Sequence, residues 1–369
     1  MKVRTIVVLL FALGLSSSLN AQKVDFSSVD EFFIIASEMM EGKEISPQQW
    51  AIFDSTGGYK EYAYRPDQVR IGIIRTSLQL SFEENKNLAL KDRILNITED
   101  EMKRDDDHQW LKKHTLINFM EMKDNLSQIQ SFRENYDFDN MITKAKSKLS
   151  SFLGVSIDSS LEFKPLYFLC QEDDAQVRGN GIYMDFNSFY KYTEEERINY
   201  LAHEFFHNYR GYYENNDFNH KNALNYYTDM IQNEGIADLI DKENGYKKYF
   251  LSTGRTQEEA QYWEDMYNNA ANDLIKLQEL ILEYSQKGIP EDTFVNKIEE
   301  IVKYNGHPIG FYMANQIVKG GYKKEMLENF YRPYEFYKLY NQVTIENGEP
   351  ALTEEYLNYI KKISEEYYH

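Results

Sequence analysis

Most of the chain follows the 3.6-residue period of amphipathic helices. The pattern is strongest in the middle of the chain, where five apolar residues recur at helical spacing: Ile198, Leu201, Ala202, Phe205 and Phe206. The segment Thr193-Glu194-Glu195-Glu196 has the form of a capping box, with Thr at the cap and Glu three residues later. These features predict a buried helix over residues 194–210.

Other segments with the same period predict that the protein is mostly helical. They cover residues 29–36, 69–80, 108–122, 126–149, 256–285, 291–304, 307–319 and 353–368, with a further helix around Met230 that ends at Gly245. Between residues 161 and 186 the period changes, because residues 161–169 and 181–186 have strand-like patterns with a turn at residues 172–174. We therefore expect an α+β fold, mostly helical, with a small sheet.

The helix over residues 194–210 carries the pattern HExxH as His203, Glu204 and His207. Residues four apart lie on one face of a helix, so both imidazoles would point at one place, as two metal ligands must. Glu204 would lie beside them, where it can take a proton from a water molecule held by the metal. The alternative is two surface histidines beside an acid. Phe205 and Phe206 argue against it, because they indicate a buried helix, and buried imidazoles need a common partner.

A catalytic zinc ion has three protein ligands and one position open for water, so a third ligand is required. The HExxHxxGxxH pattern of the metzincins would need Gly and His where the chain has Arg210 and Tyr213, which excludes it. His220 is a second possibility, although its polar surroundings predict a loop. The third possibility is Glu234, on the next predicted helix.

Glu234 and Asp238 are neighbours on the polar face of that helix, four residues apart. Glu234 can complete a set of two His and one Glu. Asp238 can accept a hydrogen bond from the outer nitrogen of a zinc-bound His, which fixes the tautomer and orientation of the ring. Gly235 in mid-helix costs about 1 kcal/mol relative to Ala, so we expect close packing against another backbone there. The alternative is two solvated acids on an exposed face.

The first 21 residues predict a cleavable export signal. A basic start over residues 1–4 precedes an apolar run over residues 5–15, which is too short to span a bilayer, and small residues lead to a cut after Ala21. The mature protein would then be periplasmic or secreted, without a membrane span. The chain contains one cysteine, Cys170, so an intrachain disulfide is excluded.

The stretch HEFFH followed by NEGIAD resembles the gluzincin group of zinc metallopeptidases, whose thermolysin-like members carry HExxH and then Asn-Glu-x-x-x-Asp. The resemblance implies a zincin-like catalytic domain with one zinc ion per chain. The implied ligands are His203, His207 and Glu234, the implied general base is Glu204, and Asp238 would be the partner of a zinc-bound His. With the export signal and the stretch GHPIGFYMA, the wider pattern is similar to an uncharacterised family of zinc-dependent peptidases from Bacteroidetes.

Two further expectations concern the substrate. Peptide hydrolysis needs a hydrogen-bond donor for the developing oxyanion, and we prefer His307 to Tyr312 because it stands at the predicted start of a helix. The alternative for His307 is a capping or packing role. In zincin folds a peptide substrate pairs with the edge strand of the sheet, and the strand over residues 181–186 is either that edge or an ordinary core strand.

The sequence therefore predicts an exported zinc metallopeptidase in three parts: a signal peptide at residues 1–21, a helical N-terminal region at residues 22–150, and a zincin-like domain at residues 151–369. The resemblance implies peptide or protein substrates as partners. The formal net charge of −19 opposes binding to nucleic acid and anionic membranes. Two alternatives stay open. One is a zinc hydrolase with a non-peptide substrate. The other is a non-catalytic exported binding protein, whose zinc is absent or held by four protein ligands.

Overall fold

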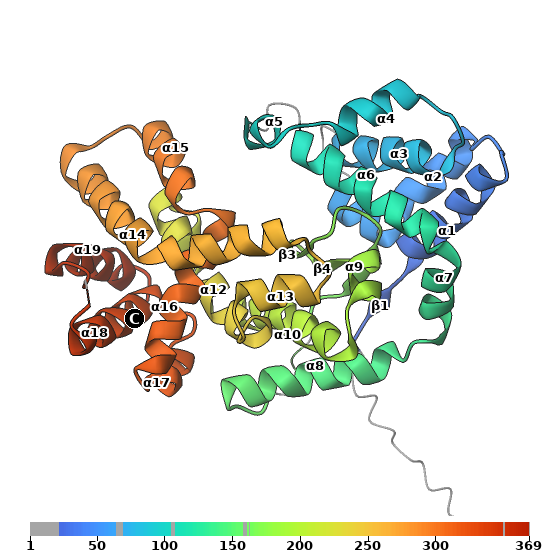
Figure 1. Cartoon of the computed structure of the whole chain (residues 1–369). Helices are drawn as coiled ribbons and strands as arrows, with labels where there is room; N and C mark the ends of the chain where they lie inside the picture. The colour runs from blue at the N-terminus through green and yellow to red at the C-terminus, as the bar shows by residue number, and fades with distance from the viewer. Residues whose placement is uncertain are drawn as a thin grey trace, which may run out of the picture.

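The computed structural model describes residues 22–63, 69–104, 108–157, 161, 163–349 and 351–368. The predicted signal peptide lies outside the described residues. Within them, helices predominate and four short strands form one mixed sheet, which confirms a mostly helical chain with a small sheet (Figure 1). Among the described residues, no helix combines the length and the apolar character needed to cross a bilayer.

Helices make up most of the first part of the chain. They are α1 (Ser27–Met40), α2 (Pro47–Ser55), the π-helix η1 (Tyr59–Ala63), α3 (Val69–Phe82), α4 (Leu88–Leu95), α5 (Glu99–Arg104), α6 (Gln109–Asp124), α7 (Leu126–Asn135) and α8 (Phe138–Leu153). The prediction of one helix over residues 126–149 is wrong. Tyr136 is extended and ends α7, and the side chain of Asp137 accepts a hydrogen bond from the backbone N–H of Asn140 to begin α8.

The sheet has the order β1-β2-β4-β3 and joins both parts of the chain. Its strands are β1 (Val24–Asp25), β2 (Leu166–Leu169), β3 (Ala175–Arg178) and β4 (Gly181–Asp185). The first three in spatial order are parallel, with Leu166 opposite Ile182, and β3 is antiparallel to β4. Because β1 precedes the N-terminal helices and pairs with β2, the predicted N-terminal and catalytic regions share one sheet and one hydrophobic core.

Of the two alternatives for the strand over residues 181–186, the structure shows the ordinary core strand. That strand is β4, which lies between β2 and β3 and is buried along its whole length. The edge next to it is β3, whose four residues are partly exposed and which packs against the HExxH helix. The sequence pattern does not predict β3, because four residues of mixed polarity give too short a pattern.

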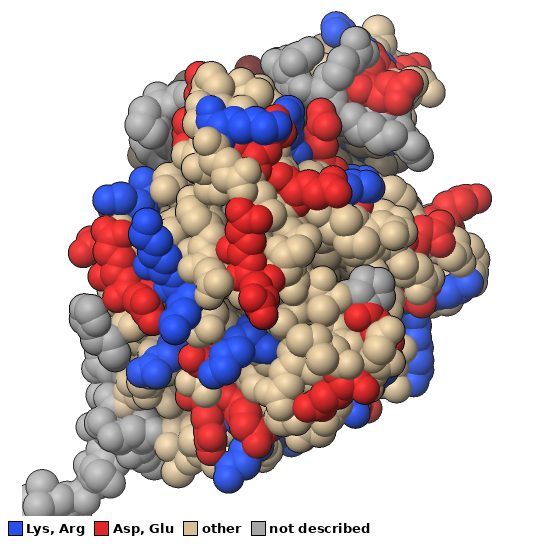
Figure 2. Space-filling model, turned by 90° about the vertical axis from the view of Figure 1, so that its left-hand side faces the viewer, with Lys and Arg blue, Asp and Glu red and all other residues tan. Residues whose placement is uncertain are grey.

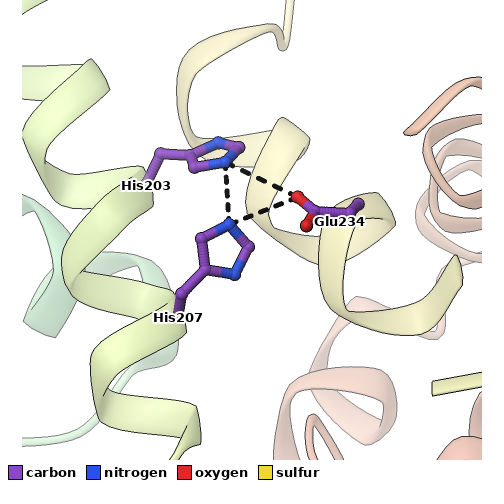
Figure 3. A group of neighbouring side chains, drawn as sticks. All are labelled: His203, His207 and Glu234. Carbon is purple, nitrogen blue, oxygen red and sulfur yellow. Dashed lines mark hydrogen bonds and ion pairs between the residues drawn. The ribbon is translucent and has the colours of Figure 1, made fainter. Parts of the chain in front are cut away.

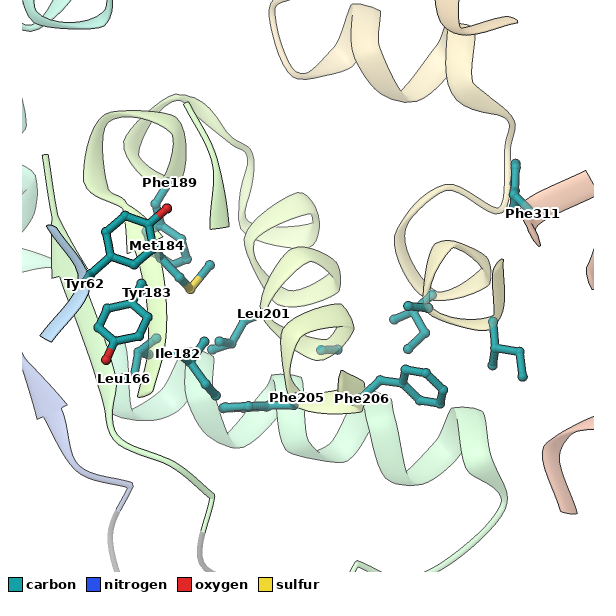
Figure 4. Close-up of a cluster of buried hydrophobic side chains, with 14 of the residues drawn as sticks. Tyr62, Leu166, Ile182, Tyr183, Met184, Phe189, Leu201, Phe205, Phe206 and Phe311 are labelled. Atoms are coloured by element: carbon teal, nitrogen blue, oxygen red, sulfur yellow. The ribbon is translucent and has the colours of Figure 1, made fainter. Parts of the chain in front are cut away.

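The middle of the chain contains the helices that carry the predicted site. They are α9 (Phe186–Lys191), α10 (Glu194–Arg210), α11 (Asn216–Asn219), α12 (Ala223–Asp241) and α13 (Tyr246–Ser252). Helix α10 has the predicted bounds, and Thr193 and Glu196 form the predicted capping box. Figure 4 shows Leu201 of this helix directed toward the sheet and Phe206 directed to the opposite side, and both side chains are fully buried. Helix α12 ends at Asp241, before the predicted end at Gly245.

The last part of the chain is again helical and lies on the left in Figure 1. It contains α14 (Gln257–Lys287), α15 (Glu291–Ile301), the 3₁₀ turn η2 (Tyr304–Gly306), α16 (His307–Lys319), α17 (Lys323–Glu328), α18 (Pro333–Asn347) and α19 (Glu354–Glu365). On the face that this side of the molecule presents, acidic and basic side chains are interspersed (Figure 2).

Helices α12 and α16 touch through their backbones at two glycines. A Cβ atom at Gly235 would lie 2.2 Å from the carbonyl carbon of Gly310, and one at Gly310 would lie 2.0 Å from the carbonyl oxygen of Ile231. This confirms the prediction that Gly235 packs closely against another backbone. The contact fixes the start of α16, where His307 stands, beside the part of α12 that carries Glu234.

Candidate metal centre

Helix α10 directs His203 and His207 at one point. Their Nε2 atoms lie 3.0 Å apart, as expected for residues one helical turn apart, and both rings face helix α12 (Figure 3). His203 is 4% exposed. Burial lowers the pKa of His203 well below its ordinary value, which favours the neutral ring that binds metal ions.

Helix α12 brings Glu234 to the same point. Its Oε2 atom lies 3.2 Å from Nε2 of His207 and 3.8 Å from Nε2 of His203. The ligand atoms of the three residues all lie within 4.8 Å of one another, so the structure brings the three predicted ligands together. Two His nitrogens and one Glu oxygen are a ligand set of catalytic zinc.

The buried Glu234 carboxylate attracts positive charge. Its Oε2 is buried and accepts no hydrogen bond, although imidazole nitrogens surround it. Burial raises the pKa of Glu234, but the nearby His307 and His207 lower it to about 2, so the group is ionised. For His207 the effects are reversed: burial lowers its pKa, whereas the nearby Glu234 raises it to about 9. A cation at this point would satisfy the unpartnered oxygen, so the residues fit a bound zinc ion.

The outer nitrogens of both imidazoles have hydrogen-bond partners on α12. Nδ1 of His203 lies 3.1 Å from Oδ1 of Asp241, and Nδ1 of His207 lies 2.9 Å from Oδ1 of Asn233. Both partners are acceptors, so each Nδ1 donates its hydrogen, and in the neutral ring Nε2 has the lone pair that would bind a metal. Neither partner was predicted from the sequence. Asp241 could have been found, because it lies two helical turns after Glu234 on the same face.

Asp238 lies at the centre but mainly contacts a different histidine. Its Oδ1 is 2.9 Å from Nδ1 of His307, whereas the nearest nitrogen of His203 is 3.8 Å away. Its Oδ2 accepts a hydrogen bond of 2.6 Å from the hydroxyl of Tyr246. The partner of the candidate ligand His203 is therefore Asp241, and Asp238 orients His307.

Lys242 joins the two carboxylates into one buried network. Its Nζ lies 2.8 Å from Oδ1 of Asp238 and 2.7 Å from Oδ2 of Asp241. His203, Asp238 and Asp241 also form a second group close enough to hold a metal ion. Because Lys242 already pairs with both of these carboxylates, the group with Glu234 is the better cation site.

His307 lies next to the three candidate ligands. Its Nε2 is 3.2 Å from Oε2 of Glu234, and its side chain is 22% exposed, more than those of the candidate ligands. Tyr312 instead packs its ring against Tyr267 and Tyr340. His220 is exposed at the end of α11, and among the described residues it belongs to neither group of candidate ligands. Of these three sequence candidates, the structure therefore brings only His307 to the centre.

Glu204 is buried at the side of the candidate ligands. It is 4% exposed, and its Oε2 atom has no hydrogen-bond partner among the described residues. Burial raises the pKa of Glu204 to about 8, and the charges of Glu234 and Asp174 act in the same direction. The Oε2 atom is therefore available to accept a proton from a water molecule beside it, as a general base does.

A comparison with known protein families shows the family to which the chain belongs. A family model described as "Putative zinc dependent peptidase (DUF5700)" matches residues 50–349. The chain belongs to this family. The matched segment contains every residue of the candidate centre and extends across position 150, the predicted boundary between the two regions. Neither a curated protein nor a solved structure matches the chain.

Membership of the DUF5700 family agrees with the coarse prediction from the sequence. The description of the family names zinc as the metal and a peptide as the substrate. The candidate ligands supply the donor atoms that such a zinc ion requires.

Proposed function

We propose that this DUF5700 chain is an exported metallopeptidase of the gluzincin type, with one zinc ion held by His203, His207 and Glu234. The observation that carries the proposal is the convergence of two imidazole nitrogens and one carboxylate oxygen within 4.8 Å, from two buried helices. The buried Glu204 beside them supports a catalytic rather than a structural centre. Export rests on the composition of residues 1–21.

Glu204 is the general base and acid of the proposed reaction. When bound, zinc would polarise the scissile carbonyl and acidify a water molecule. Glu204 takes the proton of the attacking water and passes it to the nitrogen of the leaving amine.

His307 donates a hydrogen bond to the oxyanion that forms at the carbonyl. Burial lowers the pKa of His307, but Asp238 and Glu234 raise it above its ordinary value. The protonated ring donates from both nitrogens, from Nδ1 to Asp238 and from Nε2 toward the centre. A donor fixed by a buried carboxylate stabilises developing negative charge without reorganising.

Strand β3 positions the peptide main chain in this proposal. An extended peptide can add a strand to a sheet edge, where main-chain hydrogen bonds supply affinity. Support comes from the position of β3 at the edge, antiparallel to β4 and packed against α10. A peptide paired with β3 would pass alongside the helix that carries HExxH.

The test is hydrolysis of internally quenched peptides by the mature protein, compared with ester substrates that contain no peptide bond. We expect cleavage of peptides, loss of cleavage when a chelator removes the metal, and recovery when zinc is added back. Cleavage of esters alone would favour the non-peptide hydrolase. Zinc-loaded protein that cleaves neither class would favour a binding protein.

A further inference from the structure

The turn before His307 has an unusual backbone. Tyr304, Asn305 and Gly306 have φ values of 48°, 53° and 90°, all in the left-handed region. Glycine adopts this region readily and Asn tolerates it, but a Tyr there is uncommon. Strained residues of this kind concentrate at functional sites and persist only where the surrounding structure holds them.

Close packing against the ligand-bearing helix holds this turn. A Cβ atom at Gly306 would lie 2.8 Å from Cγ1 and 3.1 Å from Cα of Ile231. Ile231 stands about one helical turn before Glu234 on α12. The position of the turn relative to the candidate metal centre is therefore fixed by a contact that only glycine allows.

The strained turn presents an aromatic surface beside His307. The ring of Tyr304 lies 4.4 Å from that of Trp263, centroid to centroid, and Tyr304 is 46% exposed. The ring of Trp263 lies 6.4 Å from that of His307. Tyr262, which is 42% exposed, lies 6.4 Å from Tyr304 and extends the same surface. The ring of Trp263 thus borders the residue that faces Glu234, and the rings of Tyr304 and Tyr262 continue the surface from it.

We propose that Tyr304 and Trp263 form a binding subsite for an aromatic or branched aliphatic side chain of the peptide substrate, next to the scissile bond. The proposal rests on the proposed function, because the occupant is a residue of the peptide being cleaved. A substrate carbonyl near His307 would place the adjoining side chain beside Trp263, whose ring also packs against Phe250 and Tyr246. Packing against two rings would stabilise an apolar side chain there and leave a methyl group with little contact.

The experiment compares two quenched peptides that differ at one position flanking the cleaved bond, Phe in one and Ala in the other. The variant Tyr304→Asn removes the ring but keeps the turn, because Asn tolerates the left-handed region. The matched control Tyr304→Phe keeps the ring and removes only the hydroxyl. We expect the preference for Phe over Ala, measured as a ratio of kcat/KM, to fall about 10-fold in Tyr304→Asn and to stay unchanged in Tyr304→Phe.

The lower kcat/KM of Tyr304→Asn for the Phe peptide should come from a higher KM. Its kcat and metal content should be close to those of the wild type, because the ring binds the substrate and takes no part in the reaction. An unchanged preference in Tyr304→Asn, with a wild type that cleaves peptides, would overturn the subsite and leave the proposed function standing. A zinc-loaded wild type that cleaves no peptide would overturn the proposed function and the subsite with it.

Discussion

Replacing Glu204 with Gln should leave one zinc ion per chain and lower kcat about 10³-fold. Gln has nearly the same shape as Glu, so helix α10 and the candidate ligands should keep their positions. It cannot accept the proton of the attacking water, and that step is the role proposed for the buried carboxylate. The measurements are zinc content and steady-state hydrolysis of a quenched peptide.

The matched control for this substitution is Glu195→Gln. Glu195 is exposed in the first turn of the same helix, so the same chemical change there should leave kcat within twofold, roughly the level of a neutral surface substitution. Wild-type turnover in Glu204→Gln would show that another group accepts the proton.

Replacing Gly235 with Ala should destabilise the protein by about 3 kcal/mol, although Ala is the better helix former. The new Cβ would lie 2.2 Å from the backbone of Gly310, and a backbone atom cannot turn aside as a flexible side chain can. Helix α16 must move, and His307 at its start moves with it. The free energy of unfolding in urea measures the first effect, and peptidase activity measures the second.

Gly72→Ala is the matched control for Gly235→Ala. Gly72 is exposed within helix α3, and a Cβ atom there meets no atom within 4 Å. The same substitution should therefore stabilise the protein by up to about 1 kcal/mol. Equal effects at the two positions would contradict the account of the contact between α12 and α16.

The elements predicted most accurately are those whose sequence signals lie within the element itself. Helix α10 has the predicted bounds because its capping box and its apolar period lie within one segment. The prediction that His203 and His207 face one point needed only helix geometry. Placing Glu234 beside them needed a second helix, which was found from its period and from the polar pair that it carries with Asp238.

The features that sequence reasoning missed depend on how the helices and strands pack. Asp238 contacts His307 because α16 lies against α12 through two glycines, and helical spacing alone does not reveal that arrangement. Asp241 takes the place expected of Asp238 beside His203, which depends on how α12 packs against α10. Strand β3 is short and partly exposed, so its position at the sheet edge follows from pairing with β4 rather than from its own residues.

The central claim is that two helices hold one zinc ion, and the most direct test is the metal content of the mature protein purified without chelator. We expect one zinc ion per chain in the wild type and in the control Glu243→Ala, an exposed acid just after α12. We expect clear loss of zinc in Glu234→Ala, which removes the ligand that attracts the cation. A wild type that takes up no zinc when zinc is supplied, or a Glu234→Ala variant that holds it as tightly as the wild type, would contradict the assigned centre.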